Sequence, residues 1–180
     1  FSELNKAKRE DRPTPDPHQD EAIEAVINGF ETAQRGQMIM ACGTGKTYTS
    51  LWVKEALNAK TTLVLLPSLG LVSQTLWEWT FASNTPFEVL CVCSDETVGK
   101  KPNTDEIVSS IQDVSFPTTS DPEEIKKFLK RDVNKVIFCT YHSSPTIAKV
   151  QKNSRLEQFD LVIADEAHRC TGEVGKAFTT

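Results

Sequence analysis

The fold expected for this sequence follows from one stretch: Met40-Ala41-Cys42-Gly43-Thr44-Gly45-Lys46-Thr47. An apolar segment at residues 38–40, which we expect to be a strand, leads into it, and a segment of helical character follows at residues 47–58. A phosphate-binding loop requires this context, whereas a chance glycine-rich turn needs neither strand nor helix. Gly43 and Gly45 let the backbone curl so that its N–H groups, including that of Thr44, point at phosphate oxygens. The stretch therefore predicts a phosphate-binding loop.

Two side chains at the end of this loop have the chemistry of nucleotide binding. Lys46 would reach the β- and γ-phosphates, and the hydroxyl of Thr47 would ligate Mg²⁺. The general pattern G-x-x-x-x-G-K-[ST] has glycine at its first position, where this chain has Met40. The departure matters little if Met40 ends the strand.

A second motif at residues 161–168, Leu-Val-Ile-Ala-Asp-Glu-Ala-His, is an apolar strand that ends in two acids. Ligands of open α/β sheets bind at the carboxyl ends of parallel strands. Asp165 could hold Mg²⁺ there through water, and Glu166 could orient and deprotonate an attacking water. His168 lies two residues beyond this pair and could link the nucleotide to a neighbouring segment.

Apolar runs alternate with helix-like segments along the whole chain. The runs are short, and they lie at residues 38–40, 63–66, 89–93, 136–138 and 161–163. The helix-like segments lie at residues 18–35, 47–58, 69–80 and 121–132. Strands that are apolar throughout and alternate with helices indicate a mainly parallel sheet with helices on both faces. The predicted fold class is therefore α/β.

Local signals mark the ends and faces of two helices. In the first helix the apolar residues recur at i, i+3, i+4 and i+7, as Ile23, Val26, Ile27 and Phe30. In the helix at residues 121–132, Asp121 is the expected N-cap and Pro122 the first helical residue. Residues 1–17 are polar with alternate prolines and predict an extended lead-in. Residues 94–120 are polar too, with a possible short helix at residues 105–112.

Composition limits the class of protein. The chain has 180 residues and a formal charge of −5, and 38% of its residues are hydrophobic. These values suit one folded domain and exclude a protein that binds nucleic acid through bulk positive charge. The longest apolar runs fall far short of the ~18 residues that a membrane span needs, so we expect no membrane partner. The five cysteines form no C-x-x-C pair; we expect Cys91 and Cys93 to be core residues and the compartment to be reducing and cytoplasmic.

With both motifs in place, the chain resembles a DEAH-box motor of helicase superfamily two. More narrowly, it is similar to the motors of type III and single-polypeptide type I restriction–modification enzymes. The residues that carry this likeness are residues 40–47, Pro67-Ser68-Leu69 with Gln74, Thr140-Tyr141 and residues 165–169. The likeness covers nearly all of residues 17–172. It implies that residues 18–180 are the N-terminal RecA-like lobe of a P-loop ATPase.

The resemblance implies roles for residues outside the two nucleotide motifs. Pro17-His18-Gln19 is similar to an adenine-reading motif, in which the Gln19 amide would pair with the N6/N7 edge of the base. The family commonly has an arginine before that proline, where this chain has Asp16. Three hydroxyl residues at strand ends occupy places where the family contacts the nucleic-acid backbone, and each is equally suited to capping: Ser68, Thr140 and Tyr141. Such contacts hold phosphates without much net charge.

The resemblance further implies an ATP-dependent DNA helicase or translocase, of which this chain would be one of two lobes. Catalysis would depend on Lys46, Asp165 and Glu166, with ATP and with Mg²⁺ on Thr47 and Asp165. Double-stranded DNA and a second RecA-like lobe in cis would be the partners. That lobe does not occur before Thr180, so the isolated first lobe is expected to be nearly inactive. An RNA helicase of the same superfamily and a P-loop nucleotide switch stay open, because phosphate contacts do not distinguish DNA from RNA.

Overall fold

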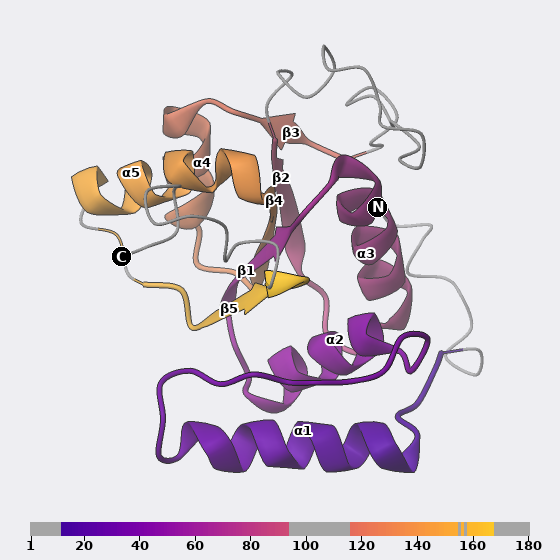
Figure 1. The fold of residues 1–180 in the computed structure, drawn as a ribbon. Helices are drawn as coiled ribbons and strands as arrows, with labels where there is room; N and C mark the ends of the chain where they lie inside the picture. The colour runs from indigo at the N-terminus through magenta and orange to yellow at the C-terminus, as the bar shows by residue number, and fades with distance from the viewer. Residues whose placement is uncertain (1–11, 94–115, 155, 157, 168–180) are drawn as a thin grey trace. The chain divides into compact units, whose positions relative to one another are not determined.

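The computed structural model describes residues 12–93, 116–154, 156 and 158–167 (Figure 1). Its elements follow in the order α1 (Pro17–Phe30), α2 (Lys46–Ala56), β1 (Thr61–Leu66), α3 (Leu69–Ala82), β2 (Glu88–Val92), β3 (Thr118–Thr119), α4 (Pro122–Leu129), β4 (Lys135–Thr140), the 3₁₀ helix η5 (Tyr141–Ser143), α5 (Ser144–Ser154) and β5 (Leu161–Ala164). None of the helices within these ranges has the length and apolar character to cross a membrane.

The chain divides into two compact units. The first comprises the residues up to Ala59 together with Thr75–Pro86, and it contains α1 and α2. The second comprises Lys60–Gln74 and the residues from Phe87 onward, and it contains all five strands. The phosphate-binding loop thus belongs to the first unit and the acidic motif to the second.

The strands of the second unit form an all-parallel sheet in the order β3-β2-β4-β1-β5. β1 lies between β4 and β5. Its last residue, Leu66, is level with Thr140 of β4, and Leu65 is level with Ala164 of β5. The carboxyl ends of these three strands therefore reach the same edge of the sheet, as the α/β prediction requires.

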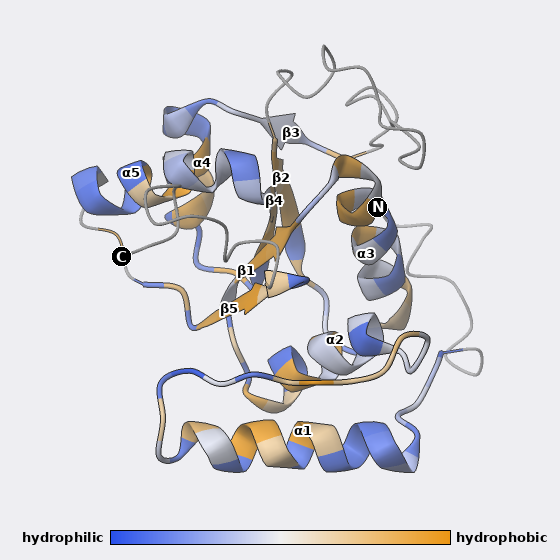
Figure 2. Ribbon diagram, viewed as in Figure 1, coloured by the Kyte–Doolittle hydropathy of each residue, from blue (hydrophilic) through white to orange (hydrophobic). Residues whose placement is uncertain are grey.

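The central strands β1, β2 and β4 are buried on both faces of this sheet, which fits their largely apolar sequences. On one face, residues of β1, β2 and β4 pack with residues of α4 and α5 in a cluster that includes Leu63, Leu90, Ile137, Cys139, Ile125, Phe128, Ile147 and Val150. α4 and α5 lie together beside the sheet, and the central strands show largely hydrophobic colours (Figures 1 and 2). The alternate residues Val64, Val136 and Phe138 point to the other face and are at most 1% exposed.

Most predicted elements are present within a few residues of their expected bounds. α4 begins as its sequence indicates, because the Asp121 side chain accepts a hydrogen bond of 3.0 Å from the backbone N–H of Glu123 and Pro122 follows the cap. Cys91 and Cys93 are buried core residues, as predicted. The possible helix at residues 105–112 lies outside the described residues.

Two predicted elements differ from the structure. Residues 38–40 do not form a strand in the described part of the chain, and Ile39 is 89% exposed. The first helix ends at Phe30 and not at residue 35. There the backbone N–H and the hydroxyl of Thr32 both donate to the carbonyl of Gly29, which replaces the helical pattern with a turn.

Sequence reasoning also left out two elements. α5 follows β4 through a 3₁₀ turn, and β3 is a two-residue strand inside the polar stretch before α4. β3 is too short for a periodic pattern, and α5 carries a weak one, with Ile147 and Val150 as its buried apolar residues.

Candidate functional site

The loop before α2 has the conformation that its glycines indicate. Gly43 has φ 77° and Gly45 has φ 75°, in the left-handed region that side chains disfavour. Gly45 is also the N-cap of α2, and no side chain caps the helix there. A Cβ atom on Gly45 would lie 2.3 Å from Nε2 of Gln19. The loop therefore leaves the first N–H groups of α2 available to an anion, which is the basis of phosphate binding at helix N-termini.

Lys46 turns back over this loop. Its Nζ donates to the carbonyl oxygens of Met40 and Ala41, each at 3.4 Å. The hydroxyl of Thr44 donates to the same Ala41 carbonyl at 2.8 Å and closes the turn. The ammonium group is thus held by long bonds to neutral carbonyls, and phosphate oxygens would be stronger acceptors for it.

Gln19 ties the start of α1 to the phosphate-binding loop. The side chain is 5% exposed; its Oε1 accepts from the backbone N–H of Asp16 at 2.8 Å, and its Nε2 donates to the carbonyl of Thr44 at 3.0 Å. Nε2 of His18 lies 3.3 Å from the same Thr44 oxygen. An amide nitrogen has two protons, so these bonds leave Gln19 able to donate one more.

A cavity of about 260 Å³ opens beside Gln19 and the loop. It is bordered by Gly43–Gly45 and by two aromatic residues of α2, Tyr48 and Trp52. The two rings are stacked with centroids 5.9 Å apart. Burial, and then the charge of Glu78, raises the pKa of Tyr48. Sequence reasoning missed this aromatic pair, although its i, i+4 spacing on the helix after the loop was a usable signal.

Bonds from the second half of α3 hold α2 in place within the first unit. The fully buried indole of Trp79 donates to the carbonyl of Thr47 at 3.0 Å. At the other end of α2, the carboxylate of Glu55 accepts bonds from the backbone and side chains of residues 83–85. The helix that carries the loop is therefore fixed near both of its ends.

In the second unit, Asp165 and Glu166 form a tight turn at the carboxyl end of β5. The N–H of Asp165 donates to the carbonyl of Leu65 at 3.0 Å, and its Oδ1 accepts from the N–H of Glu166, also at 3.0 Å. Glu166 has φ 54°. The hydroxyl of Tyr141 donates to the carbonyl of Asp165 at 2.6 Å. The acids therefore lie at the predicted edge, in a turn held from β1 and from the end of β4.

The three predicted nucleic-acid contacts lie at that same edge, but each hydroxyl has a partner inside the chain. Oγ of Ser68 accepts from the N–H of Leu71 at 3.3 Å and so caps α3. Thr140 is 5% exposed and donates to Oγ of Ser143 at 3.1 Å. Tyr141 bonds to Asp165, a link for which the sequence carries no signal. Capping, the alternative reading of these hydroxyls, is thus observed for Ser68.

The structure groups the predicted site residues by unit. Gln19 and the loop with its lysine lie together in the first, and the strand-end hydroxyls lie with the two acids in the second. His168 falls outside the described residues. Among the residues that the structure does describe, no three His, Cys, Asp or Glu side chains gather into a metal site.

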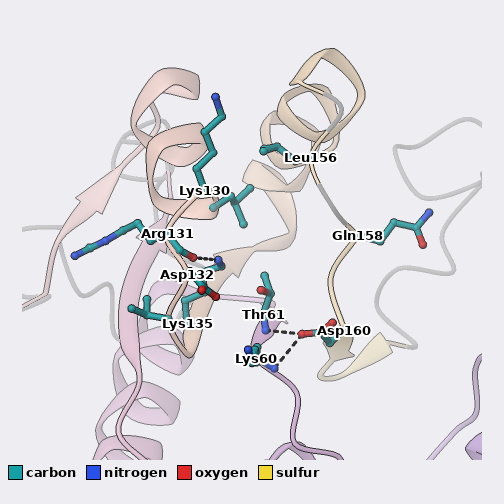
Figure 3. A pocket seen from close by; sticks show the side chains of 11 residues that line it. Lys60, Thr61, Lys130, Arg131, Asp132, Lys135, Leu156, Gln158 and Asp160 are labelled. Atoms are coloured by element: carbon teal, nitrogen blue, oxygen red, sulfur yellow. Dashed lines mark hydrogen bonds between the residues drawn. The ribbon is translucent and has the colours of Figure 1, made fainter.

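A second cavity, of about 470 Å³, lies at the opposite edge of the sheet, at the amino ends of β1 and β4 (Figure 3). Three of its charged side chains, Asp160, Lys135 and Arg131, are engaged in internal bonds. Asp160 accepts from the first two backbone N–H groups at the start of β1, at 2.9 and 2.8 Å. Lys135 donates to the carbonyl of Arg131, and Arg131 pairs with Glu88 at 2.6 Å. This cavity lies at the amino ends of the strands and contains none of the predicted site residues.

Comparison with known proteins agrees with this geometry. Residues 12–179 match the protein family described as "Type III restriction enzyme, res subunit". The chain is 31% identical over 153 residues to the probable helicase A859L of African swine fever virus (isolate Tick/Malawi/Lil 20-1/1983), and 30% identical to its counterpart in isolate Pig/Kenya/KEN-50/1950. Each of these alignments covers 83% of this chain.

Two solved structures are similar to it. One is a nuclease-deletion mutant of the Type ISP restriction–modification enzyme LlaGI in complex with a DNA substrate mimic, with 32% identity, a TM-score of 0.69 and 87% of this chain covered. The other is the ATP-dependent Type ISP restriction–modification enzyme LlaBIII bound to DNA, with 30% identity, a TM-score of 0.76 and 97% of this chain covered. The chain spans 16% of the viral proteins, 15% of the LlaGI chain and 12% of the LlaBIII chain.

Proposed function

Because this chain belongs to the family of type III restriction enzyme res subunits, we propose that it is the ATP-binding lobe of a DNA helicase or translocase that drives a restriction–modification enzyme. The observation that carries the proposal is the loop at residues 43–47, with two glycines at positive φ before an uncapped helix. A lysine bonded only loosely to loop carbonyls lies directly at this helix start. These features suit a triphosphate.

The residues of the first unit fit ATP. The backbone of Gly43, Thr44 and Gly45 would hold phosphate oxygens, and Lys46 would exchange its carbonyl partners for the β- and γ-phosphates. Gln19 has one amide proton left for a base edge, and a cavity with two stacked aromatic rings lies beside it. This amide would read adenine while it holds the loop.

Hydrolysis would depend on the second motif. When bound, Mg²⁺ would offset negative charge on the phosphates, with Thr47 and Asp165 as its protein partners. Glu166 would orient water and accept its proton. Hydrogen bonds hold the backbone of the turn and the Asp165 carboxylate, which supports this assignment.

Double-stranded DNA is the proposed track, with a second RecA-like lobe in cis in the full-length protein. The related LlaBIII enzyme is described as bound to DNA, and Ser68 and Thr140 follow or end strands at the same end of the sheet as the acidic turn. In this proposal His168 couples the nucleotide to a neighbouring segment, and residues 18–180 alone turn over almost no ATP. Among the described cysteines, Cys42, Cys91 and Cys139 are free thiols, which fits a reducing, cytoplasmic location.

The test is ATP hydrolysis by the full-length protein, titrated with duplex DNA and, separately, with duplex RNA. We expect stimulation by DNA, and a loss of about 10²-fold or more in kcat for Glu166→Gln. Glu124→Gln, on the exposed side of α4, is the matched control and should leave kcat unchanged. Stimulation by RNA alone would favour the RNA helicase alternative, and hydrolysis that ignores both nucleic acids would contradict a motor.

A further inference from the structure

A tyrosine bridges two strand ends at the carboxyl edge of the sheet. Tyr141 begins η5 directly after β4, and its hydroxyl donates to the carbonyl of Asp165, which follows β5, at 2.6 Å. In the sheet order, β1 lies between these two strands. The side chain therefore spans the end of β1 to reach the acidic turn.

The turn that it reaches needs support. Glu166 has φ 54°, a left-handed conformation that residues other than glycine adopt only at an energetic cost. Both backbone polar groups of Asp165 are hydrogen-bonded. Its N–H donates to the carbonyl of Leu65, and its carbonyl accepts from the hydroxyl of Tyr141. The Asp165 carbonyl belongs to the peptide that joins it to Glu166, so the Tyr141 bond sets the plane of that peptide.

We propose that Tyr141 is a positioning residue for ATP hydrolysis. This role rests on the proposed function of the protein in ATP hydrolysis. By holding the Asp165–Glu166 peptide, the Tyr141 hydroxyl keeps the Glu166 carboxylate aimed at the attacking water. A small displacement of a catalytic group lowers turnover far more than it lowers substrate binding. Loss of this bond should therefore appear in kcat and not in affinity.

The same bond weighs against a phosphate contact by the Tyr141 hydroxyl. A phenol has one proton to donate, and the oxygens of a DNA phosphate are acceptors only. The proton of Tyr141 already goes to Asp165 at 2.6 Å. Donation to a phosphate would break this bond and release the turn, so positioning and backbone contact are competing roles for this hydroxyl.

The test compares Tyr141→Phe with Ser144→Ala in the full-length protein. Tyr141→Phe removes only the hydroxyl, and we expect kcat for DNA-stimulated ATP hydrolysis to fall about three- to tenfold, the equivalent of one hydrogen bond. KM for ATP and Kd for duplex DNA should stay within about twofold. Ser144→Ala removes a comparable bond, from its hydroxyl to the carbonyl of Tyr141 at 2.9 Å, and should lower the melting temperature similarly while leaving kcat unchanged.

Three results would overturn the inference. These are an unchanged kcat in Tyr141→Phe, a loss of DNA affinity with normal kcat at saturating DNA, and an equal loss of kcat in Ser144→Ala, which would indicate general loosening. Failure of the proposed function looks different, because the wild-type protein itself would then lack DNA-stimulated hydrolysis, or Lys46→Ala would hydrolyse ATP as well as wild type. Either of those two results would overturn both proposals together.

Discussion

Gly45 is subject to two constraints that a residue with a side chain would violate. Its φ of 75° lies where side chains are disfavoured, and a Cβ there would approach Nε2 of Gln19 to 2.3 Å. Gly43 has nearly the same φ, 77°, but a Cβ there would meet nothing within 4 Å beyond its own chain neighbours. A side chain at Gly43 would therefore cause backbone strain alone, whereas one at Gly45 would cause strain and a steric clash with Gln19.

Alanine substitutions at these positions should differ in their cost. Gly43→Ala should lower the free energy of unfolding by about 1 kcal/mol, from strain alone. Gly45→Ala should lower it by about 2–3 kcal/mol, because Gln19 must also move and release Thr44. Denaturant unfolding of both variants measures this difference. Equal losses would mean that Gln19 does not press against the loop.

The residues of the phosphate-binding loop and the two acids could be predicted from sequence, because each type has a fixed chemical role at a fixed spacing. The partners of the hydroxyl residues could not. Ser68 caps a helix, and Tyr141 reaches a carbonyl 24 residues away. Such bonds depend on which strands are neighbours, and sequence spacing does not encode that.

At the scale of elements, Glu55 joins the end of α2 to the turn after α3. Its carboxylate accepts from the hydroxyl of Ser83 at 2.9 Å, from the backbone N–H of Asn84 at 2.7 Å and from that of Thr85 at 3.2 Å. The amide of Asn84 adds a bond of 3.0 Å to the second carboxylate oxygen. One charged group thus satisfies several donors where α3 ends.

Glu55→Gln should destabilise the protein, because an amide offers one acceptor oxygen in place of two and carries no charge. We expect the free energy of unfolding to fall by about 1.5–3 kcal/mol. Glu24→Gln, on an exposed position of α1, is the matched control and should change it by less than about 0.5 kcal/mol. A Glu55 variant as stable as this control would refute the structural role of the network.

The central strands β2 and β4 carry buried thiols. Burial, and then the neighbouring Cys93, raises the pKa of Cys91 from 9.0 to about 12. Burial raises the pKa of Cys139 still further, with contributions from Cys93 and Cys91. A thiol with a raised pKa holds its proton more tightly in the folded than in the unfolded protein. The stability that this difference in pKa contributes is complete below pH 9. It is lost as the pH rises toward 12, because the thiol of the unfolded protein ionises first.

Alkaline unfolding should reveal this linkage. Between pH 9.5 and 11, each buried thiol should steepen the fall in the free energy of unfolding by about 1.4 kcal/mol per pH unit. Cys91→Ala should lose that part of the slope, whatever its stability at pH 7. Cys42→Ala removes an exposed thiol and should keep the full slope. Identical slopes in the two variants would show that Cys91 does not contribute.

Elements were predictable where a local signal and burial agree. Asp121 and Pro122 start α4 as expected, and the apolar runs of β1, β2, β4 and β5 are strands. Residues 38–40 have the same apolar character but do not form a strand, and Ile39 is exposed. Hydropathy alone does not distinguish such an exposed apolar run from a buried strand.

For the whole molecule, the net charge of −5 limits how this part of the protein could hold nucleic acid. A net negative charge disfavours bulk attraction, so the proposed contacts, through hydroxyls and backbone N–H groups at the carboxyl edge, should have a weak salt dependence. Family membership and the all-parallel sheet agree with the α/β motor fold inferred from two short motifs. Activity on DNA is a proposal for the full-length protein.

The central claim is that the loop at residues 43–47 binds ATP, and calorimetry tests it most directly. ATP is titrated in the presence of Mg²⁺ into the full-length protein, its Lys46→Ala variant and a Lys60→Ala control, whose exposed lysine lies in the other unit, just before β1. We predict that Lys46→Ala weakens binding by about 10- to 100-fold, through loss of charge-assisted bonds to phosphate, and that Lys60→Ala binds as wild type. Unchanged affinity in Lys46→Ala would contradict the account.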